Sequence, residues 1–187
     1  MYKLLVVILS FTFINCISLN VAAQYLVESK VTFGKILKFE QSKGSVKKAD
    51  LRQGPLLKPG PPGIPEITVY KRAMVFQRVM GTDTLEAVYT SESDKKLEDA
   101  SHVQTGEFIW RVPGRNRLME IRDGLLLSLD GNQRTFAANR KKLKKGMVSY
   151  TYLFSDPAGF PKVAIDYMEK KRVPSRLLMR IDYNAVK

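Results

Sequence analysis

Segments in which apolar and polar side chains alternate dominate the chain from Gly106 to its C-terminus. Because successive side chains of a β-strand point to opposite faces, such segments predict strands with one buried face. The segment EFIWRV places Phe108, Trp110 and Val112 on one face, and SRLLMRIDY alternates in the same way over 175–183. The C-terminal half is therefore predicted to be a series of short strands joined by tight turns.

Two Asp-Gly pairs mark the sharpest turns predicted in this region. Asp-Gly favours two-residue hairpin turns, whose central residues need a positive φ. Asp123-Gly124 separates RLMEIR from LLLSL, and Asp130-Gly131 follows seven residues later, so we interpret the flanking segments as strands. Further strands are predicted at 84–91, 147–154 and 160–168, and over 25–39, either as one strand or as two that turn at Gly34.

The segment 66–80 fits a helix as well as a strand. Pro65 suits a first helical turn and Gly81 suits a C-terminal stop, so a helix is the favoured interpretation, although the residues are also β-prone. Residues 91–99 predict a charged loop or one helical turn. The whole pattern predicts a mainly β (α+β) fold, an antiparallel meander of roughly eight to ten strands with room for one helix. A sheet of this length curls and must cover one face.

Residues 1–23 have the pattern of a secretion signal. Lys3 precedes an apolar run, Leu4–Ile14, which is short for a membrane span, and Val21-Ala22-Ala23 offers a cleavage site before Gln24. A membrane anchor, a buried first helix and lipidation at Cys16 are the alternatives. Since Cys16 is the only cysteine, the mature chain would have no disulfide. We predict an exported protein of the bacterial periplasm or outer-membrane periphery.

Beyond the signal, composition divides the chain into three parts. Residues 24–53 are predicted to be an N-terminal strand segment, and residues 66–187 a single β-rich domain. Between them, residues 54–65 read GPLLKPGPPGIP and contain five prolines, which predicts an extended linker.

Charge is concentrated towards the C-terminus. The formal net charge is +13, and residues 111–187 carry 17 basic and 7 acidic groups. The segment 139–146 is predicted to be a basic connector. Such a balance favours contact with phospholipid head groups, envelope polysaccharide or an acidic protein, and nucleic acid is disfavoured by the expected export. A solvated basic surface is the alternative. The candidate anionic-partner face comprises Arg140, Lys141, Lys142, Lys144, Lys145, Lys170, Lys171 and Arg172.

Little in the sequence points to catalysis. His102 is the only histidine and lies in a polar segment, so a histidine-dependent triad could use no other residue. The acidic residues Asp94, Glu98 and Asp99 are interspersed with lysines and are better interpreted as a charged surface turn than as a metal site. No phosphate-binding glycine loop is present. We therefore expect a non-catalytic protein without cofactor or metal, although a carboxylate pair assembled by the fold would not be visible in the sequence.

The order of motifs over residues 66–137 resembles the periplasmic outer-membrane lipoprotein carrier family, the LolA/LolB-like proteins. Gly106, Glu107, Trp110 and Pro113 have a spacing like that of the family, and Arg117 follows where many members have arginine. Asp130-Gly131 comes 17 residues after the proline, close to the family interval, TLEAVYTS is similar to the strand before the glycine, and 66–80 is similar to the helix before that strand. Val112 is a departure, because members often have arginine directly before the proline, where it helps to hold a helical lid shut.

The resemblance implies a curved, unclosed antiparallel barrel with one or more short helices as a lid over its concave face. It also implies a carrier or chaperone that binds acyl chains of lipoproteins or other lipids in an apolar cavity. A basic envelope-associated binding or structural module is the alternative function. Candidate residues for the cavity lining are Phe108, Trp110, Leu118, Leu125, Leu127, Leu129 and Phe136.

Overall fold

The structure is a computed structural model that describes residues 25, 28, 30–63, 65–112, 114–130, 135–143, 146–155, 162–171 and 173–184. Its elements in chain order are α2 (Phe33–Ser42), β1 (Val46–Lys58), β2 (Ile67–Met80), β3 (Asp83–Ser93), β4 (Thr105–Arg111), α3 (Arg115–Asp130), β5 (Thr135–Lys142), β6 (Met147–Ser155), β7 (Lys162–Lys170) and β8 (Val173–Asp182).

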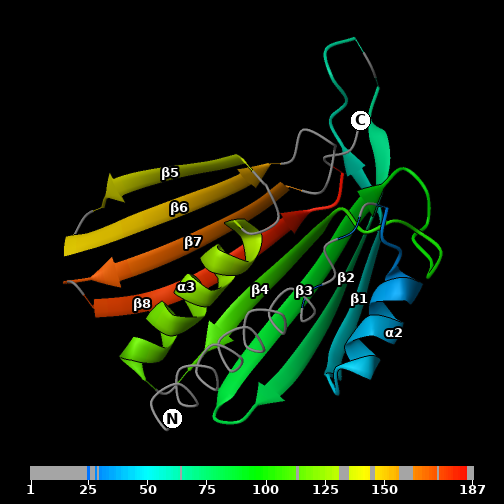
Figure 1. The fold of residues 1–187 in the computed structure, drawn as a ribbon. Coiled ribbons are helices and arrows are strands. Elements are labelled where there is room, and N and C mark those ends of the chain that lie inside the picture. The colour runs from blue at the N-terminus through cyan, green and yellow to red at the C-terminus, as the bar shows by residue number, and fades with distance from the viewer. Residues whose placement is uncertain are drawn as a thin grey trace, which may run out of the picture.

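The strands form one unclosed antiparallel sheet in the order β1-β2-β3-β4-β8-β7-β6-β5. Strands β1–β4 and β5–β8 each form an up-and-down meander, and the pairing of β4 with β8 joins the two halves. The sheet curves around the two helices, which lie on the same face (Figure 1). The predicted mainly β, antiparallel, unclosed architecture is therefore confirmed.

One hydrophobic core lies between the helix-bearing face of the sheet and the two helices. Alternate residues of each strand point into it, as the period of two predicts. The sheet contributes residues that include Met74, Phe76, Leu85, Tyr89, Phe108, Trp110, Ile165, Tyr167, Met179 and Ile181, and the helices contribute Phe33, Ile36, Leu118, Leu125 and Leu129. The opposite face is polar, with cross-strand ion pairs such as Arg180–Glu107, whose Nε–Oε1 distance is 2.9 Å.

The predicted strand over 25–39 is wrong for residues 33–39, which belong to α2. The Thr32 hydroxyl caps this helix by accepting a hydrogen bond from the Lys35 backbone N–H at 3.2 Å. Phe33, Ile36 and Glu40 are buried, a spacing of three and four residues that suits one helix face. The apolar residues of this stretch fit both periods, and the cap together with burial against the sheet favours the helix.

The predicted hairpin at Asp123-Gly124 is also wrong, because RLMEIR and LLLSL lie within α3. Leu118, Leu125 and Leu129 are seven and four residues apart, so a helix brings them to one face, where all three are buried. An Asp-Gly pair permits a turn but does not require one. Asp130, predicted to begin the next turn, is the last residue of α3, and Gly131 lies outside the described residues.

The predicted linker 54–65 is shorter than expected, because residues 54–58 continue β1. Leu56, Leu57 and Lys58 pair with Val69, Thr68 and Ile67 of β2 after a register shift. Proline is tolerated here because β1 is an edge strand and the irregularity falls beside Pro55. The N-terminal segment therefore shares one sheet with the remainder of the chain.

Residues 67–80, for which a helix was favoured, form strand β2. This segment pairs along its length with β1 and β3, and tertiary pairing overrides its helical spacing. The strands predicted at 84–91, 107–112, 147–154, 160–168 and 175–183 correspond to β3, β4, β6, β7 and β8. Residues 139–142 of the predicted basic connector are the end of β5.

Candidate functional site

The apolar residues beneath α3 form the best candidate for a ligand site. Of the seven residues predicted to line a cavity, Phe108, Trp110, Leu118, Leu125 and Leu129 are buried in the one core cluster. These five residues come from β4 and α3, so the fold brings together side chains that lie on separate elements. In this structure they contact one another and their neighbours as core.

Leu127 does not belong to this cluster. On a strand it would share a face with Leu125 and Leu129, but α3 turns it to solvent, where the residue is 71 % exposed. Phe136 is a residue of β5 opposite Phe154, and its side chain lies outside the described part of the chain. The structure therefore places five of the predicted lining residues in the core and one at the surface, and their role in binding stays a prediction.

Tyr25 is a core residue that the sequence did not single out. Its ring packs edge-on against Phe108 and Trp110, at centroid distances of 5.1 and 5.9 Å. Burial raises the pKa of its hydroxyl, and Arg78 opposes that shift in part. The aromatic residues of the cluster thus include Tyr25, the second residue of the predicted mature chain.

An ion pair attaches the first turn of α3 to the sheet. Arg117 donates from Nε to Oδ2 of Asp83 at 2.8 Å and from Nη1 to Oε2 of Glu120 at 2.9 Å. Asp83 is buried at the start of β3, and the hydrogen bond to Asp83 is the main cause that raises the Arg117 pKa. Because Arg117 is half exposed, water can compete for this attachment.

Farther along α3, Arg122 stacks on the ring of Tyr167 in β7, with its guanidinium carbon 4.5 Å from the ring centroid. Arg122 also contacts the carboxylate of Asp123 at 2.8 Å. Burial raises the pKa of Tyr167 to about 12. The helix is thus held on the sheet by its leucines and by two arginines, Arg117 and Arg122.

A buried polar network fixes α2, and sequence analysis missed it. Glu40 is fully buried and accepts hydrogen bonds from Arg78 Nη2 at 2.9 Å and from the Tyr89 hydroxyl at 2.6 Å. Ser45 also donates to Glu40. Burial is the main cause that raises the Tyr89 pKa well above its ordinary value, and the Glu40 charge adds to it. The helical spacing from Phe33 and Ile36 to Glu40 was the available signal for its burial.

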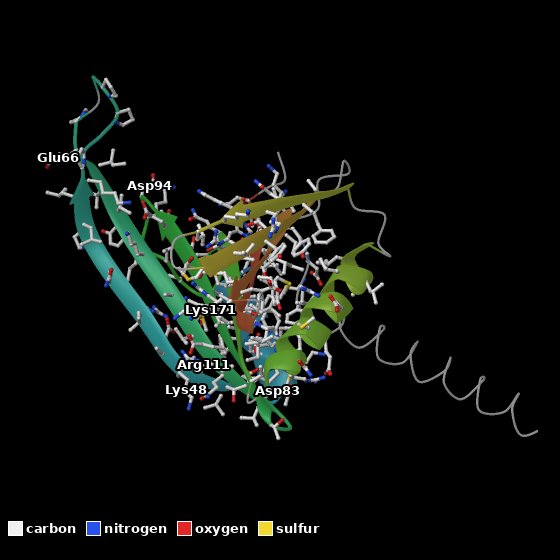
Figure 2. All side chains as sticks on the ribbon, turned by 90° about the vertical axis from the view of Figure 1, so that its left-hand side faces the viewer. Lys48, Glu66, Asp83, Asp94, Arg111 and Lys171 are labelled. Atoms are coloured by element: carbon white, nitrogen blue, oxygen red, sulfur yellow. The ribbon has the colours of Figure 1, made fainter. Side chains whose placement is uncertain are left out.

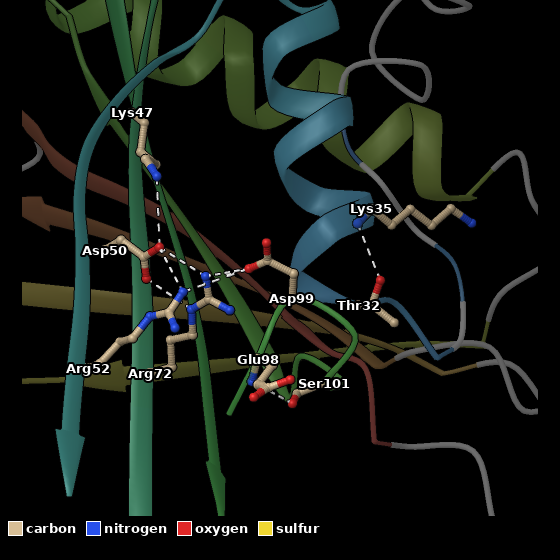
Figure 3. A network of polar contacts seen from close by, with 9 residues as sticks. All are labelled: Thr32, Lys35, Lys47, Asp50, Arg52, Arg72, Glu98, Asp99 and Ser101. Carbon is tan, nitrogen blue, oxygen red and sulfur yellow. Dashed lines mark hydrogen bonds and ion pairs between the residues drawn. The ribbon is translucent and has the colours of Figure 1, made fainter. Parts of the chain in front are cut away.

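A second network joins β1, β2 and the loop after β3 (Figure 3). Arg72, which is buried, donates to both carboxylate oxygens of Asp50 at 2.9 Å and to Asp99 at 2.7 Å. Its guanidinium also lies 4.5 Å from the ring centroid of Phe33 at the start of α2. The hydrogen bond from Arg72 lowers the pKa of Asp50 to about 2. Asp99 lies in an exposed turn, as predicted, and also pairs with a buried cation, which the sequence did not indicate.

Two open pockets lie on the face opposite the helices. One, of about 430 Å³, is lined by Leu153, Ala164 and Arg180 among others, and the other, of about 390 Å³, by Leu51, Lys71 and Glu92 among others. Most of their lining residues alternate along the strands with buried residues, and Phe154 and Val163 of the core also border the first pocket. Neither pocket contains any of the residues predicted to line a cavity.

The fold brings the basic residues of two separate segments together. Arg140, Lys141 and Lys142 are exposed at the end of β5, and Lys170 and Lys171 are exposed where β7 turns into β8. The turns are neighbours, because the Lys171 N–H donates to the Gly146 carbonyl at 3.0 Å and Met147 pairs with Lys170. The side chains of Lys144, Lys145 and Arg172 lie outside the described residues.

His102 is exposed beside the isolated bridge that it forms with Thr32. Within the described ranges, no group of three or more His, Cys, Asp or Glu side chains could hold a metal ion. In that same part of the chain, every helix is too short or too polar to cross a membrane.

Comparisons with protein-family models, curated proteins and solved structures found no match to the chain.

Proposed function

We propose that the protein is a non-catalytic carrier that binds acyl chains of lipoproteins or other lipids between the sheet and α3. The observation that supports this proposal is the apolar cluster of Phe108, Trp110 and the α3 leucines on the curved face of an unclosed sheet. One side of that cluster is a single helix, so displacing the helix would expose a continuous apolar surface. The motifs of β3 and β4 that resemble the lipoprotein carrier family support the same function, whereas residues 67–80 form a strand where the family pattern has a helix.

The energetics of an acyl chain suit such a site. Each buried CH₂ group contributes about 0.8 kcal/mol, so one long chain supplies on the order of 10 kcal/mol before the costs of ordering are subtracted. Because the cluster is packed as core, the acyl chain would replace contacts between α3 and the sheet. Binding therefore requires that α3 move while the sheet stays in place.

The attachment of α3 by Arg117 provides the sharpest test of this proposal. Replacing Arg117 with Gln removes its charge-assisted hydrogen bonds to Asp83 and Glu120. Because Arg117 is half exposed, we take the lower value for such bonds, about 1.5 kcal/mol of stabilisation in all. We expect palmitate or a palmitoylated peptide to associate about tenfold faster with Arg117→Gln than with the wild type. Trp110 is the only tryptophan and lies in the apolar cluster, so the change in its emission intensity measures binding that saturates near one ligand per protein.

Two matched variants serve as controls for that measurement. Arg111→Gln removes an exposed arginine whose Nη2 lies 3.5 Å from Glu86 on the opposite face, and it should leave the association rate unchanged. Leu127→Glu changes an exposed residue of α3 itself and should also be neutral. If neither the wild type nor Arg117→Gln gives a saturable change in Trp110 emission with either ligand, the carrier function is wrong.

A further inference from the structure

We propose that the end of the sheet formed by the β5–β6 and β7–β8 turns is a docking surface for anionic phospholipid bilayers. This basic end is defined by Arg140, Lys141, Lys142, Lys170 and Lys171, all of them exposed. The proposal goes beyond the carrier function and does not depend on it, because neither the apolar cluster nor α3 takes part.

The charge of this end is unusually one-sided. Residues 139–148 and 168–176 together hold nine basic residues and one acidic residue, Glu169. Nineteen residues separate these two segments in the sequence, and the pairing of β6 with β7 brings their described residues side by side. A cluster that the fold assembles in this way raises the local positive potential above that of either segment alone.

The basic end also lacks acidic partners, unlike several arginines elsewhere in the fold. Arg78, Arg111 and Arg117 form ion pairs with Glu40, Glu86 and Asp83. By contrast, the five residues that define the basic end form no ion pair with any described residue. Their charge is therefore available to an external anion.

The kind of side chain favours a bilayer over an anion held in a shaped site. Four of the five residues are lysines, whose flexible ammonium groups act as point charges and suit a fluid surface of head groups. Leu143 and Met147, which are half-buried, flank the β5–β6 turn and offer apolar area beside the lysines. Lys171 lies apart from the acidic side chains of Glu66 and Asp94 in Figure 2.

Vesicle flotation tests the surface directly. The wild type should float with phosphatidylglycerol-containing vesicles but not with phosphatidylcholine vesicles, and binding should fall steeply between about 0.1 M and about 1 M salt. Lys141→Glu combined with Lys170→Glu takes one lysine from each segment. Since each lysine near an anionic surface contributes about fivefold to partitioning, the double variant should bind at least about 25-fold more weakly.

The control has the same change in net charge at a different place. Lys95→Glu combined with Lys96→Glu alters two exposed residues in the loop after β3 and should retain most of the binding. A Lys141→Gln and Lys170→Gln pair repeats the test if the charge-reversed protein aggregates. If the Lys95/Lys96 variant loses as much vesicle binding as the Lys141/Lys170 variant, the assignment of the surface is overturned. Equal binding to phosphatidylcholine vesicles would overturn the anionic bilayer as the partner of this surface. So would binding to single-stranded DNA or to an acidic protein in the absence of vesicle binding.

Discussion

At the scale of single residues, the buried charges determine much of how the N-terminal half is held. Glu40, Arg78 and Tyr89 form one network, and Arg72 with Asp50 and Asp99 forms the other. Each network joins elements that are distant in the sequence. Such long-range partners leave no local pattern, which is why sequence analysis identified neither the ion pair of Asp99 nor the burial of Glu40.

Asp50 should make the stability of the protein depend on acid pH. Its pKa is lowered from an ordinary value of 3.8 to about 2, so the folded state favours the charged carboxylate. The resulting stability is fully present above about pH 4 and is lost as the pH falls towards 2. We expect Asp50→Asn to cost about 1 to 2 kcal/mol near neutrality, allowing for partial exposure, and almost nothing near pH 2.

Urea unfolding of the wild type and Asp50→Asn across this pH range measures the difference. Asp94→Asn, in the exposed loop after β3, is the control and should show no comparable pH-dependent difference. A cost of Asp50→Asn that stays constant down to pH 2 would mean that Arg72 does not stabilise the ionised form.

At the scale of elements, the sequence predicted strands far better than helices. Strands β3, β4, β6, β7 and β8 have one buried face, so their period of two is visible in the residues. Both helices were predicted as strands, because Leu125, Leu127 and Leu129 fit alternation while Leu118, Leu125 and Leu129 fit a helix. Leu127 was predicted to line the site because the strand period of two was applied to a segment that is helical.

The same element yields a prediction about glycine. Gly124 lies inside α3, and a Cβ added there would meet no heavy atom within 4 Å. Since glycine costs a helix interior roughly 0.5–1 kcal/mol relative to alanine, Gly124→Ala should stabilise the protein by about that amount. Gly44, just after α2, is equally open but has a φ of +71°, where alanine is strained.

The two glycines therefore form a matched pair. Gly44→Ala should destabilise the protein by about 1 kcal/mol, while Gly124→Ala raises the midpoint of urea unfolding. If Gly124→Ala lowers the midpoint as Gly44→Ala does, residues 123–124 do not have the helical conformation described here.

At the scale of the whole molecule, the class of fold was predictable and the division of the chain was not. The mainly β class follows from the alternation of apolar and polar residues, and the unclosed antiparallel sheet is as predicted. The prolines of residues 54–65 suggested a boundary, but an edge strand tolerates Pro55 and β1 continues through it. Strand β1 and the strands that follow residue 66 therefore share one sheet.

Export remains a prediction about the whole chain. Lys3, the apolar run and Val21-Ala22-Ala23 predict cleavage before Gln24, so N-terminal sequencing of the mature protein should begin at that residue. A mature chain that begins at a lipid-modified Cys16 would contradict this prediction and favour an anchored protein.

The order of the strands has a consequence for how the chain reaches this fold. Within each half of the sheet every pairing is between consecutive strands, but the central pairing sets Gly106 opposite Ile181. Local hairpins close quickly, whereas contacts between residues far apart in the sequence close slowly. We therefore expect the two meanders to form first and the β4–β8 seam last. Until the β4–β8 seam forms, each meander has a long edge strand without a partner. The corresponding meander of a second chain can pair with that edge, which gives a domain-swapped dimer. The seam is thus the place where crowding during folding would produce intertwined dimers.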